Sequence, residues 1–501
     1  TVAGGLVQAG KDGQLPVDTL LTVNAGAGYD LAGFAQTLNA FAGDGFISNS
    51  GLTPTTLTLD NAGAVAFSGV LADNKAVSPT STSELTLRKL GIGTLTLTGA
   101  STYFGQTNID DGKIIVGNGG SLGTGAVAIL TELDYTRTDT FTLANQFGGA
   151  GTLRFLGVNG VAKLVGNSTT SPNVVIGTNS TLQIGDNGTT GALNGGTSLT
   201  MGAGSVVRFS RTDINMPTFT ADISGTATSR IEQNGTGKTS INGGVTTFLG
   251  DVVVNAGELE AVLASGFESA RSITINAGTF TALDGALGYG MGGVGPDVTI
   301  NGGLMRLLDG TAATNNGIGD LVLNGGTVSS GAGASGFNSL LVTGTINVTN
   351  DATISAENVG LNFGGTSTAT PVEITVAATK TLTFSGSIAN DGSNFADSSF
   401  DKKGTGTLIL SGDNSGMAGN NTVTAGVLDV RNADALGTGV TTIGTGANFV
   451  SAQQVGFTNA VAGDLTVSTG GSIGVAAPGA AIIGNLKVAN LTMQSGSRID
   501  S

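Results

Sequence analysis

Apolar and small polar residues alternate in short runs along most of this chain. Runs such as residues 94–97 (Thr-Leu-Thr-Leu) and 407–410 (Thr-Leu-Ile-Leu) place Leu at every second position, and Gly, Asn or Asp closes most runs. A period of two is the pattern of a β-strand that buries one face. The chain therefore predicts many short strands that are joined by tight turns.

One segment near the start leaves a helix open as an alternative. Leu31, Phe34, Leu38 and Phe41 fall at helical spacing, so residues 31–41 could form a short amphipathic helix. Glycine and asparagine within the segment disfavour a helix. We therefore favour a strand here.

A long phrase occurs twice, which indicates an internal duplication. Residues 89–99 match residues 402–412 closely, and the strand-like runs that follow each phrase match as well. The two copies extend over about residues 54–128 and 371–444. Residues 73–84 interrupt the first copy with a polar insert that contains Pro79, and we expect a loop that leaves the wall of the fold.

The repeated phrase resembles a known family. It reads Lys-x-Gly-x-Gly-Thr-Leu-x-Leu-[Ser/Thr]-Gly from Lys89 and from Lys402, with Thr-x-[Ile/Val]-x-x-Gly-x-[Ile/Leu] and Leu-Gly-Thr-Gly after it. This is similar to the passenger-associated transport repeat, or autotransporter-associated β-strand repeat, of bacterial surface proteins. Residues 30–38 also resemble a segment that often precedes such repeats. The resemblance implies a right-handed parallel β-helix that is exported across the outer membrane and exposed outside the cell.

Four asparagines between residues 250 and 330 give the length of one coil. Asn255, Asn276, Asn301 and Asn324 are separated by 21, 25 and 23 residues, and each is followed within two residues by Gly. The spacing indicates a solenoid with about two dozen residues and three short strands per coil. We expect one continuous β-solenoid of roughly twenty coils over residues 1–501. Stacked asparagines could form a hydrogen-bonded ladder, and the glycines suit turns with positive φ.

Composition narrows the function classes. The chain has 85 Gly in 501 residues, 39% hydrophobic residues and no Cys, which excludes disulfides and thiolate sites. The net charge of −15, without clustered basic residues, argues against a nucleic-acid partner. No apolar run reaches the roughly 20 residues of a membrane helix, so we expect no membrane insertion by this segment. The first residue is not Met and no signal peptide is visible, so we expect a processed or excised part of a longer precursor.

Little catalytic chemistry is available to this chain. It contains no His, which removes the usual general base and imidazole ligands and leaves carboxylates with Lys and Arg. A polysaccharide lyase or hydrolase would need several of these groups on one face. The adjacent pairs Asp110-Asp111 and Asp401-Lys402 are candidates, but neighbours on a strand point to opposite faces. We interpret both pairs as solvated turn residues and predict no catalytic, cofactor-binding or metal-binding residue.

Three further features have an ordinary structural interpretation. Residues 292–300 look like one nonapeptide of a calcium-binding β-roll, but a single copy indicates only a turn before a strand. The basic stretches 208–211 and 88–89 are interpreted as surface charges. The aromatic residues Tyr103, Phe104 and Phe147 could stack on glycans, yet packing in the core is the stronger interpretation.

These observations favour a structural protein of the bacterial cell surface or extracellular space. We expect an adhesin, a stalk or a self-associating fibre or surface-layer subunit, with a glycan or host-surface ligand and a possible homopolymer formed end to end or laterally. The alternative is a β-helix lyase or glycoside hydrolase, for which the segments 73–84 and 135–146 would have to bring three or more carboxylates and a base together. A calcium-dependent surface-layer protein is a third possibility, which metal-dependent melting would reveal.

Overall fold

The structure is a computed structural model of the whole chain. The residues that it describes are 1–73, 83–168, 170–193, 196, 198–214, 218–245, 247–283, 285–288, 295–308, 316–330, 339–361, 370–389, 397–451, 460–461, 464–474, 487–488 and 490–499.

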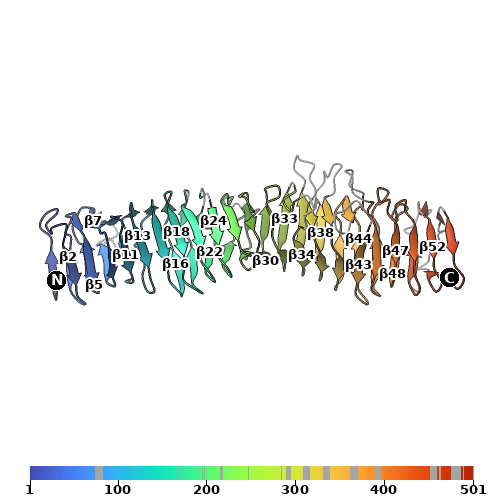
Figure 1. The fold of residues 1–501 in the computed structure, drawn as a ribbon, viewed down its shortest axis with the longest axis horizontal. Coiled ribbons are helices and arrows are strands. Elements are labelled where there is room, and N and C mark those ends of the chain that lie inside the picture. The colour runs from blue at the N-terminus through green and yellow to red at the C-terminus, as the bar shows by residue number, and fades with distance from the viewer. Residues whose placement is uncertain are drawn as a thin grey trace. The chain divides into compact units, whose positions relative to one another are not determined.

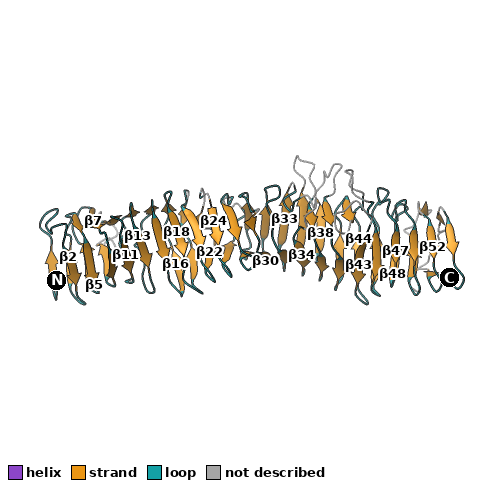
Figure 2. Cartoon of the chain, in the orientation of Figure 1, coloured by secondary structure: helices purple, strands orange, loops and turns teal. Residues whose placement is uncertain are grey.

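The described part of the chain consists of short strands and the turns between them. The strands pair in parallel with strands of the next coil, in register, and form a β-solenoid of about 18 turns. Figure 2 shows strands and loops in the described chain and no helical ribbon. The predicted parallel β-helix is thereby confirmed, and the estimate of roughly twenty coils is close.

The chain divides into two compact units, which comprise residues 1–237 and 238–501. Each unit has its own stack of parallel strands, and Figure 1 labels strands in both, from β2 (Leu20–Val23) onward. The duplication at 54–128 and 371–444 places one long copy in each unit. The prediction of one uninterrupted solenoid stays a prediction.

The first unit contains strands of five parallel sheets, whose bounds are as follows. One face holds β2 (Leu20–Val23), β5 (Ala40–Gly43), β8 (Ala64–Phe67), β11 (Thr94–Leu97), β13 (Lys113–Val116), β15 (Glu132–Tyr135), β18 (Thr152–Phe155), β21 (Asn173–Ile176), β24 (Ser198–Met201) and β26 (Asp222–Gly225). The next in chain order, here called the third face, holds β1 (Leu6–Gln8), β3 (Gly28–Asp30), β6 (Phe46–Asn49) and β9 (Val70–Asp73), and later β16 (Thr140–Leu143), β19 (Val161–Leu164), β22 (Thr181–Gly188), β25 (Val206–Arg211) and β27 (Arg230–Gln233). The remaining strands are β4 (Gln36–Leu38), β7 (Thr55–Asp60), β10 (Leu85–Leu90), β12 (Thr107–Ile109), β14 (Val127–Ile129) and β17 (Phe147–Gly148), followed by the pair β20 (Asn167–Ser168) and β23 (Ala192–Leu193).

The second unit has two long parallel sheets and shorter ones, whose bounds are as follows. The first sheet holds β30 (Asp251–Val254), β32 (Ser272–Ile275), β34 (Asp297–Ile300), β37 (Leu321–Leu323), β40 (Ile346–Val348), β43 (Val372–Val376), β45 (Phe400–Lys403), β47 (Asn421–Val423), β49 (Thr441–Ile443), β52 (Leu465–Val467) and β55 (Leu491–Met493). The second holds β28 (Lys238–Ile241), β31 (Glu258–Ala261), β33 (Thr279–Leu283), β35 (Leu304–Leu308), β38 (Thr327–Ser330), β41 (Ala352–Ile354), β44 (Thr381–Phe384), β46 (Thr407–Leu410), β48 (Val427–Val430), β50 (Asn448–Ser451), β53 (Ser472–Gly474) and β56 (Arg498–Ile499). The others are β29 (Thr247–Phe248), β36 (Gly317–Ile318), β39 (Leu340–Val342), β42 (Val359–Leu361), β51 (Ala460–Val461) and β54 (Lys487–Val488).

The number of strands per coil changes along the first unit. The opening coils carry strands on all three faces, as predicted, and β9 is the last strand of the first third-face sheet. Residues 98–106 and then residues 117–126 cross the third face without forming a strand, and the next coil contributes β16. The prediction of three strands per coil therefore holds for only part of the solenoid.

The alternating side chains form the core of each unit. In β7 and β10, Leu57 pairs with Leu87 in register, and all such inward-facing aliphatic side chains in these strands are buried. Burial of one such side chain contributes about 1.5–3 kcal/mol. Segment 31–41 contains β4 and the start of β5 and forms no helix. The preference for a strand in this segment is thereby confirmed.

The predicted asparagine ladder is present in the second unit. The Nδ2 of Asn276 donates to Oδ1 of Asn255, Asn301 donates to Asn276, and Asn324 donates to Asn301, each over 2.7 Å. The hydroxyl of Thr349 then donates to Oδ1 of Asn324. Positive φ falls on nearby glycines such as Gly257 (60°), while the asparagines themselves keep negative φ. Asparagine is therefore selected here for its amide and not for backbone freedom.

Glycines at the corners allow successive coils to approach. A Cβ built on Gly99 would lie 1.8 Å from the carbonyl oxygen of Gly69, and one built on Gly412 would lie 1.8 Å from that of Gly386. These distances are far below van der Waals contact with an immobile backbone atom. A side chain at these positions would force the coils apart.

We expect Gly99→Ala to lower the free energy of unfolding by roughly 1–3 kcal/mol, because the backbone must shift to admit the methyl group. Gly63→Ala is the matched control, since a Cβ there meets no atom within 4 Å. Urea unfolding of both variants measures the difference. Equal midpoints for the two variants would contradict the steric explanation.

Candidate functional site

The two acidic pairs singled out in the sequence do not form a shared carboxylate site. Asp110 forms an ion pair with Arg88 of the preceding coil at 2.6 Å. The exposed Asp111 accepts a hydrogen bond from the N–H of Gly112. Asp401 faces outward and accepts from the hydroxyl of Thr424 at 2.7 Å. These three carboxylates are therefore engaged in contacts between or within coils.

Lys402 corrects the sequence interpretation, because its side chain lies inside the coil. It is fully buried, and its Nζ donates to the carbonyl oxygens of Lys403 (2.9 Å), Gly404 (2.8 Å) and Ala425 (3.1 Å). An ammonium has three N–H donors, so each donor meets one carbonyl. The lysine thus closes the turn after β45 and joins it to the turn of the following coil.

Lys89 occupies the same position in the first copy, so the interpretation of residues 88–89 as surface charges is wrong for the lysine. Lys89 is fully buried, and its Nζ donates to the carbonyl oxygens of Leu90 (2.6 Å) and Gly91 (2.5 Å). A Cβ on Gly112 would lie 2.8 Å from this Nζ. Glycine at the following turn is therefore needed to make room for the amine. Arg88 does lie at the surface, as predicted.

Burial weakens the protonated form of both lysines. Desolvation lowers the pKa of Lys402 to about 8, although the charge of Asp401 acts in the opposite direction. Desolvation also lowers the pKa of Lys89, against the charges of Asp111 and Asp60. Both amines are held by backbone carbonyls and have no open approach from solvent, so they fit a structural role rather than that of a catalytic base.

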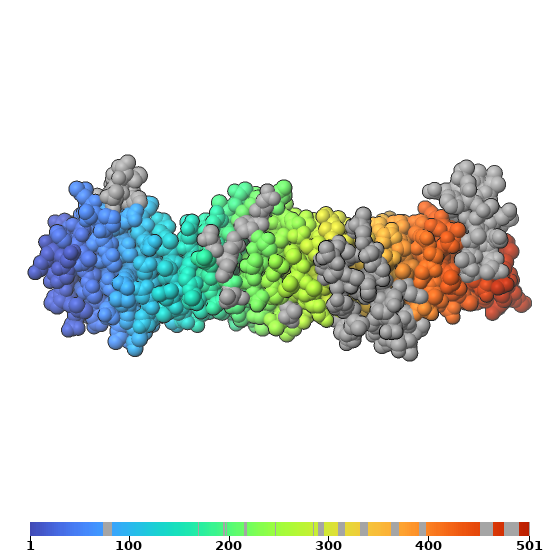
Figure 3. All heavy atoms as spheres, turned by 90° about the horizontal axis from the view of Figure 1, so that it is seen from above, coloured from blue at the N-terminus to red at the C-terminus, as the bar shows by residue number. Residues whose placement is uncertain are grey.

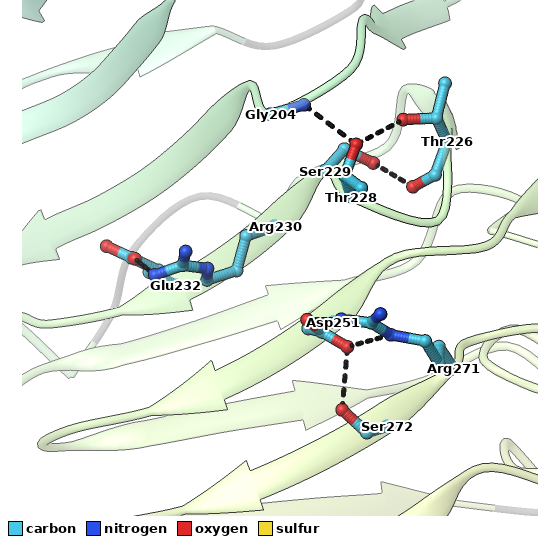
Figure 4. Close-up of polar contacts among 9 residues, drawn as sticks. All are labelled: Gly204, Thr226, Thr228, Ser229, Arg230, Glu232, Asp251, Arg271 and Ser272. Carbon is cyan, nitrogen blue, oxygen red and sulfur yellow. Dashed lines mark hydrogen bonds and ion pairs between the residues drawn. The ribbon is translucent and has the colours of Figure 1, made fainter. Parts of the chain in front are cut away.

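The basic stretch 208–211 is divided between surface and interior. Arg208 donates to Glu232 at 2.7 Å. Arg230 donates to the same carboxylate at 2.9 Å, and Figure 4 shows this second pair. Arg211 is buried and binds the carbonyl oxygen of Gly191 and both carboxylate oxygens of Asp213. The prediction of surface charges is therefore wrong for Arg211.

The second unit offers a comparable pairing between neighbouring coils. Arg271 forms an ion pair with Asp251, and the hydroxyl of Ser272 donates to the same carboxylate at 2.8 Å (Figure 4). Charged side chains on the outer faces thus mostly serve to hold adjacent coils together. Exposed pairs of this kind contribute little to stability one by one.

The aromatic candidates lie mainly in the core. Tyr103 and Phe147 are buried, as predicted, and Phe104 is 37% exposed. Tyr135, which the sequence did not single out as a candidate, stacks between Phe141 and Phe155 at 5.4 and 5.7 Å. Its hydroxyl has no hydrogen-bond partner among the described residues, and burial raises its pKa.

A hollow lies beside this aromatic stack, where β16 begins the new sheet of the third face. We call it the third-face hollow. Its volume is about 200 Å³. It is lined by Ser101, Gly120, Ser121, Leu122, Gly123, Thr124, Tyr135, Arg137, Phe141, Thr142, Leu143, Ala144 and Asn145. Figure 3 shows the surface of the first unit in blue to green from one side.

Two side chains bridge the coils around the hollow. Arg137 donates to the carbonyl oxygen of Gly120 at 2.6 Å, and Asn145 donates to those of Gly123 and Gly125 at 2.7 and 2.8 Å. The guanidinium also pairs with Asp139 and lies 4.5 Å from the ring centre of Phe141. Its hydrogen bond and charge lower the pKa of the Asp139 carboxyl.

Several predicted features receive no support from this geometry. Segment 135–146 contains one carboxylate, Asp139, which is paired with Arg137. This segment therefore does not assemble three carboxylates. Residues 74–82 of the insert and 292–294 of the β-roll-like phrase lie outside the described residues, while residues 297–300 form β34. Within the described ranges, no group of three or more Asp and Glu is placed to hold a metal ion. None of the described elements is a helix of the length and hydrophobicity that would cross a membrane.

Comparison with known proteins identifies the repeated unit. The family model described as passenger-associated-transport-repeat matches residues 87–116, 231–261 and 400–430. The chain carries passenger-associated-transport repeats. The first and third matches lie within the two copies found in the sequence, and each of the two spans two strand–turn–strand segments of successive coils.

A curated relative of the repeat protein is an autotransporter. The chain is 28% identical over 478 residues to the adhesin BmaC autotransporter of Brucella suis biovar 1 (strain 1330). The match covers 86% of this chain and 12% of that protein, so the chain spans a small part of its relative. No solved structure matches the chain.

The match at 231–261 is a repeat copy that sequence inspection missed, because Gln233 replaces the lysine. Gln233 is buried, and its Nε2 donates to the carbonyl oxygens of Gly235 (2.9 Å) and Gly237 (3.2 Å). The amide therefore closes the turn as the lysines do. For the buried position of the lysine, the signal in the sequence was strand parity, since Leu85, Leu87 and Lys89 alternate on the inward face of β10.

We expect Lys402→Met to lower the free energy of unfolding of the second unit by roughly 2–4 kcal/mol, because three partly buried carbonyl groups lose their charged donor. Lys402→Gln should recover part of the loss, since Gln233 performs this task in another repeat. Lys403→Met is the surface control and should change the midpoint little. Chemical unfolding measures all three variants, and equal destabilisation by Met and Gln would contradict the capping role.

The pKa of Lys402 also predicts a pH dependence. The folded protein has a pKa of about 8 at this amine, against 10.5 for an unperturbed lysine. Between these values the unfolded chain binds more protons, so the stability of the wild type relative to Lys402→Met should rise from pH 8 to pH 10.5. The expected gain is on the order of 3 kcal/mol at most. Unfolding at a series of pH values tests the sign, which a constant or falling difference would refute.

Proposed function

We propose that this repeat protein is a non-catalytic adhesive module of a bacterial surface or secreted protein, and that it binds its target through the outer faces of its coils. The carrying observation is the match over 86% of the chain to an autotransporter that is named an adhesin, together with three passenger-associated-transport repeats. Asp110 and Asp401 are occupied by contacts with neighbouring coils, and Lys89 and Lys402 are buried. Both observations agree with a non-catalytic role. Self-association into a fibre, end to end or laterally, stays a prediction.

The faces of the solenoid suit weak and repeated contacts. Outward positions alternate with the core positions along each strand, and each coil repeats the arrangement one strand spacing away, about 4.8 Å. The ladder from Asn255 to Asn324 is such a repeated polar row on the outside of the second unit. Several weak contacts that are linked on one scaffold can exceed a single contact in affinity by roughly 10²–10⁴.

The alternative of a polysaccharide lyase or glycoside hydrolase requires two or more free acidic groups on one face. Of the predicted carboxylates, Asp110 is paired with Arg88 and Asp401 is bound by Thr424. Glu232 is shared between two arginines. No specific observation favours this second function, and the structural role is therefore preferred.

Adhesion of coated particles tests the proposal. Microspheres that carry the full chain should bind cultured epithelial cells, and binding should rise steeply with coating density because the contacts are multivalent. The soluble chain should compete at least roughly 100-fold less well than the coated particle. Albumin-coated particles are the control. Failure to bind at any density, or release of soluble sugar from the cell-surface polysaccharide, would overturn the proposal.

A further inference from the structure

We propose that the third-face hollow binds one neutral, hydroxylated sugar ring. The inference names a ligand class for the adhesive module and in that sense rests on the proposed function. Three observations support it: the unpaired edge of β16, the hydrogen bonds from Arg137 and Asn145 to the preceding coil, and the pairing of Arg137 with Asp139, which leaves the lining nearly neutral.

The edge of β16 inside the hollow has no neighbouring strand. β16 is the end strand of its sheet and pairs with β19 on one side only. The carbonyl oxygens of Asp139 and Leu143 accept from the N–H groups of Val161 and Val165, so the residues at odd positions bond towards β19. In a parallel ladder the intervening residues turn their N–H and C=O to the opposite side. Thr142 therefore presents both groups towards residues 120–124 of the preceding coil.

No described residue satisfies the backbone of Thr142 on that side. Residues 120–124 form no strand, and their only ladder contact is the single bridge between Ser121 and Ala100. The carbonyl oxygens of Gly120 and Gly123 are occupied by Arg137 and Asn145. One N–H donor and one C=O acceptor of this exposed residue thus remain at the wall of the hollow, where the polar groups of a ligand can replace water as their partners.

Hydroxyl groups match this wall well. A hydroxyl donates and accepts, so adjacent hydroxyls of a sugar can satisfy the N–H and the C=O of Thr142 together. The apolar part of the lining consists of the exposed Ala144 and the small exposed parts of the buried Leu122, Phe141 and Leu143, which can contact the C–H face of the same ring. A volume of about 200 Å³ lies below the roughly 300 Å³ at which pockets accept drug-sized molecules. The hollow therefore fits a single ring.

The charges favour a neutral ligand. Arg137 is the one cationic residue of the lining, and its guanidinium is paired through two nitrogens with Asp139. The pair leaves little net charge for a carboxylated or phosphorylated ligand. The side-chain hydroxyls of Ser121 and Thr124 add neutral polar groups to the same wall.

A peptide strand fits less well than a sugar. Strand addition needs several alternating residues along a free edge. β16 offers Thr140 and Thr142 alone, and the side chains of Arg137 and Asn145 on either side of this strand already bond to the preceding coil. A peptide ligand is therefore an outcome that the experiment must detect, and it is not the proposal.

Two proline variants test the edge. Thr142→Pro removes the N–H that faces the hollow, and proline is tolerated at a strand edge because that N–H is not used by the ladder. Thr140→Pro is the matched control, since it lies on the same edge but outside the lining. A second pair of variants, which does not depend on proline, tests the proposal if Thr142→Pro unfolds the strand. Ala144→Phe fills the mouth of the hollow, and Ala150→Phe places the same ring at an exposed turn elsewhere.

The probes are a mixture of methyl glycosides of glucose, galactose, mannose and N-acetylglucosamine, with the blocked peptide acetyl-Val-Thr-Val-amide in a parallel sample. Saturation-transfer difference NMR with the full chain should show transfer to ring C–H protons of at least one glycoside. Thr142→Pro and Ala144→Phe should weaken binding at least roughly tenfold, while Thr140→Pro and Ala150→Phe retain it. Circular dichroism checks that each variant is folded.

Three outcomes would overturn the inference: no transfer to any glycoside, transfer that survives in both Thr142→Pro and Ala144→Phe, or transfer to the peptide alone. Particle adhesion of the same variants separates this result from the proposed function. Adhesion without glycoside transfer refutes the hollow and leaves the adhesive module in place. Glycoside transfer without adhesion refutes the adhesive module and leaves the sugar site.

Discussion

Hydrogen bonding between successive coils is the constraint on which the rest of the structure depends. Each strand can satisfy its backbone only if the next coil lies in register beside it, and at the corners this brings main chains into direct contact. Gly99 over Gly69 and Gly412 over Gly386 show how close the contact is, since no Cβ fits between them. The high glycine content is thus a consequence of stacking and not of disorder.

The buried lysines solve a second part of the same problem. In the turns after β10 and β45, the carbonyl oxygens of two successive residues accept from the side chain of a buried lysine. Lys89 and Lys402 extend from the core and supply donors to these oxygens, and Gln233 does so with an amide. A buried charge without such partners would be strongly unfavourable. The lysine of the repeat phrase is therefore part of the backbone hydrogen-bond network, which explains why it stands in an apolar row between Leu59 and Ile109.

The sequence contained most of the fold and little of the candidate site. Strand alternation, the coil length and the asparagine ladder follow from local rules that act within one or two coils, and the structure confirms each of them. The position of Lys89 can also be inferred from its parity with Leu85 and Leu87, although its charge and the neighbouring Arg88 favour a surface position. The third-face hollow could not be inferred in this way. It depends on residues 117–126 failing to form a strand while residues 140–143 succeed, which is a relation between two coils rather than a property of either segment.

That relation also explains where a specific ligand can bind on so regular a scaffold. Wherever the three faces repeat, each N–H and C=O of a strand meets its counterpart on the next coil, and nothing is left over for a ligand except side chains. A binding site that uses the backbone needs a place where the repeat changes. β16 provides such a place, because it begins a sheet beside a coil that forms no strand on the third face. Arg137 and Asn145 satisfy the carbonyl oxygens on either side of the gap, and Thr142 is the residue between them whose backbone is left open. The change in strand number along the first unit is therefore the structural origin of its most specific surface, while the regular faces supply the repeated and weaker contacts.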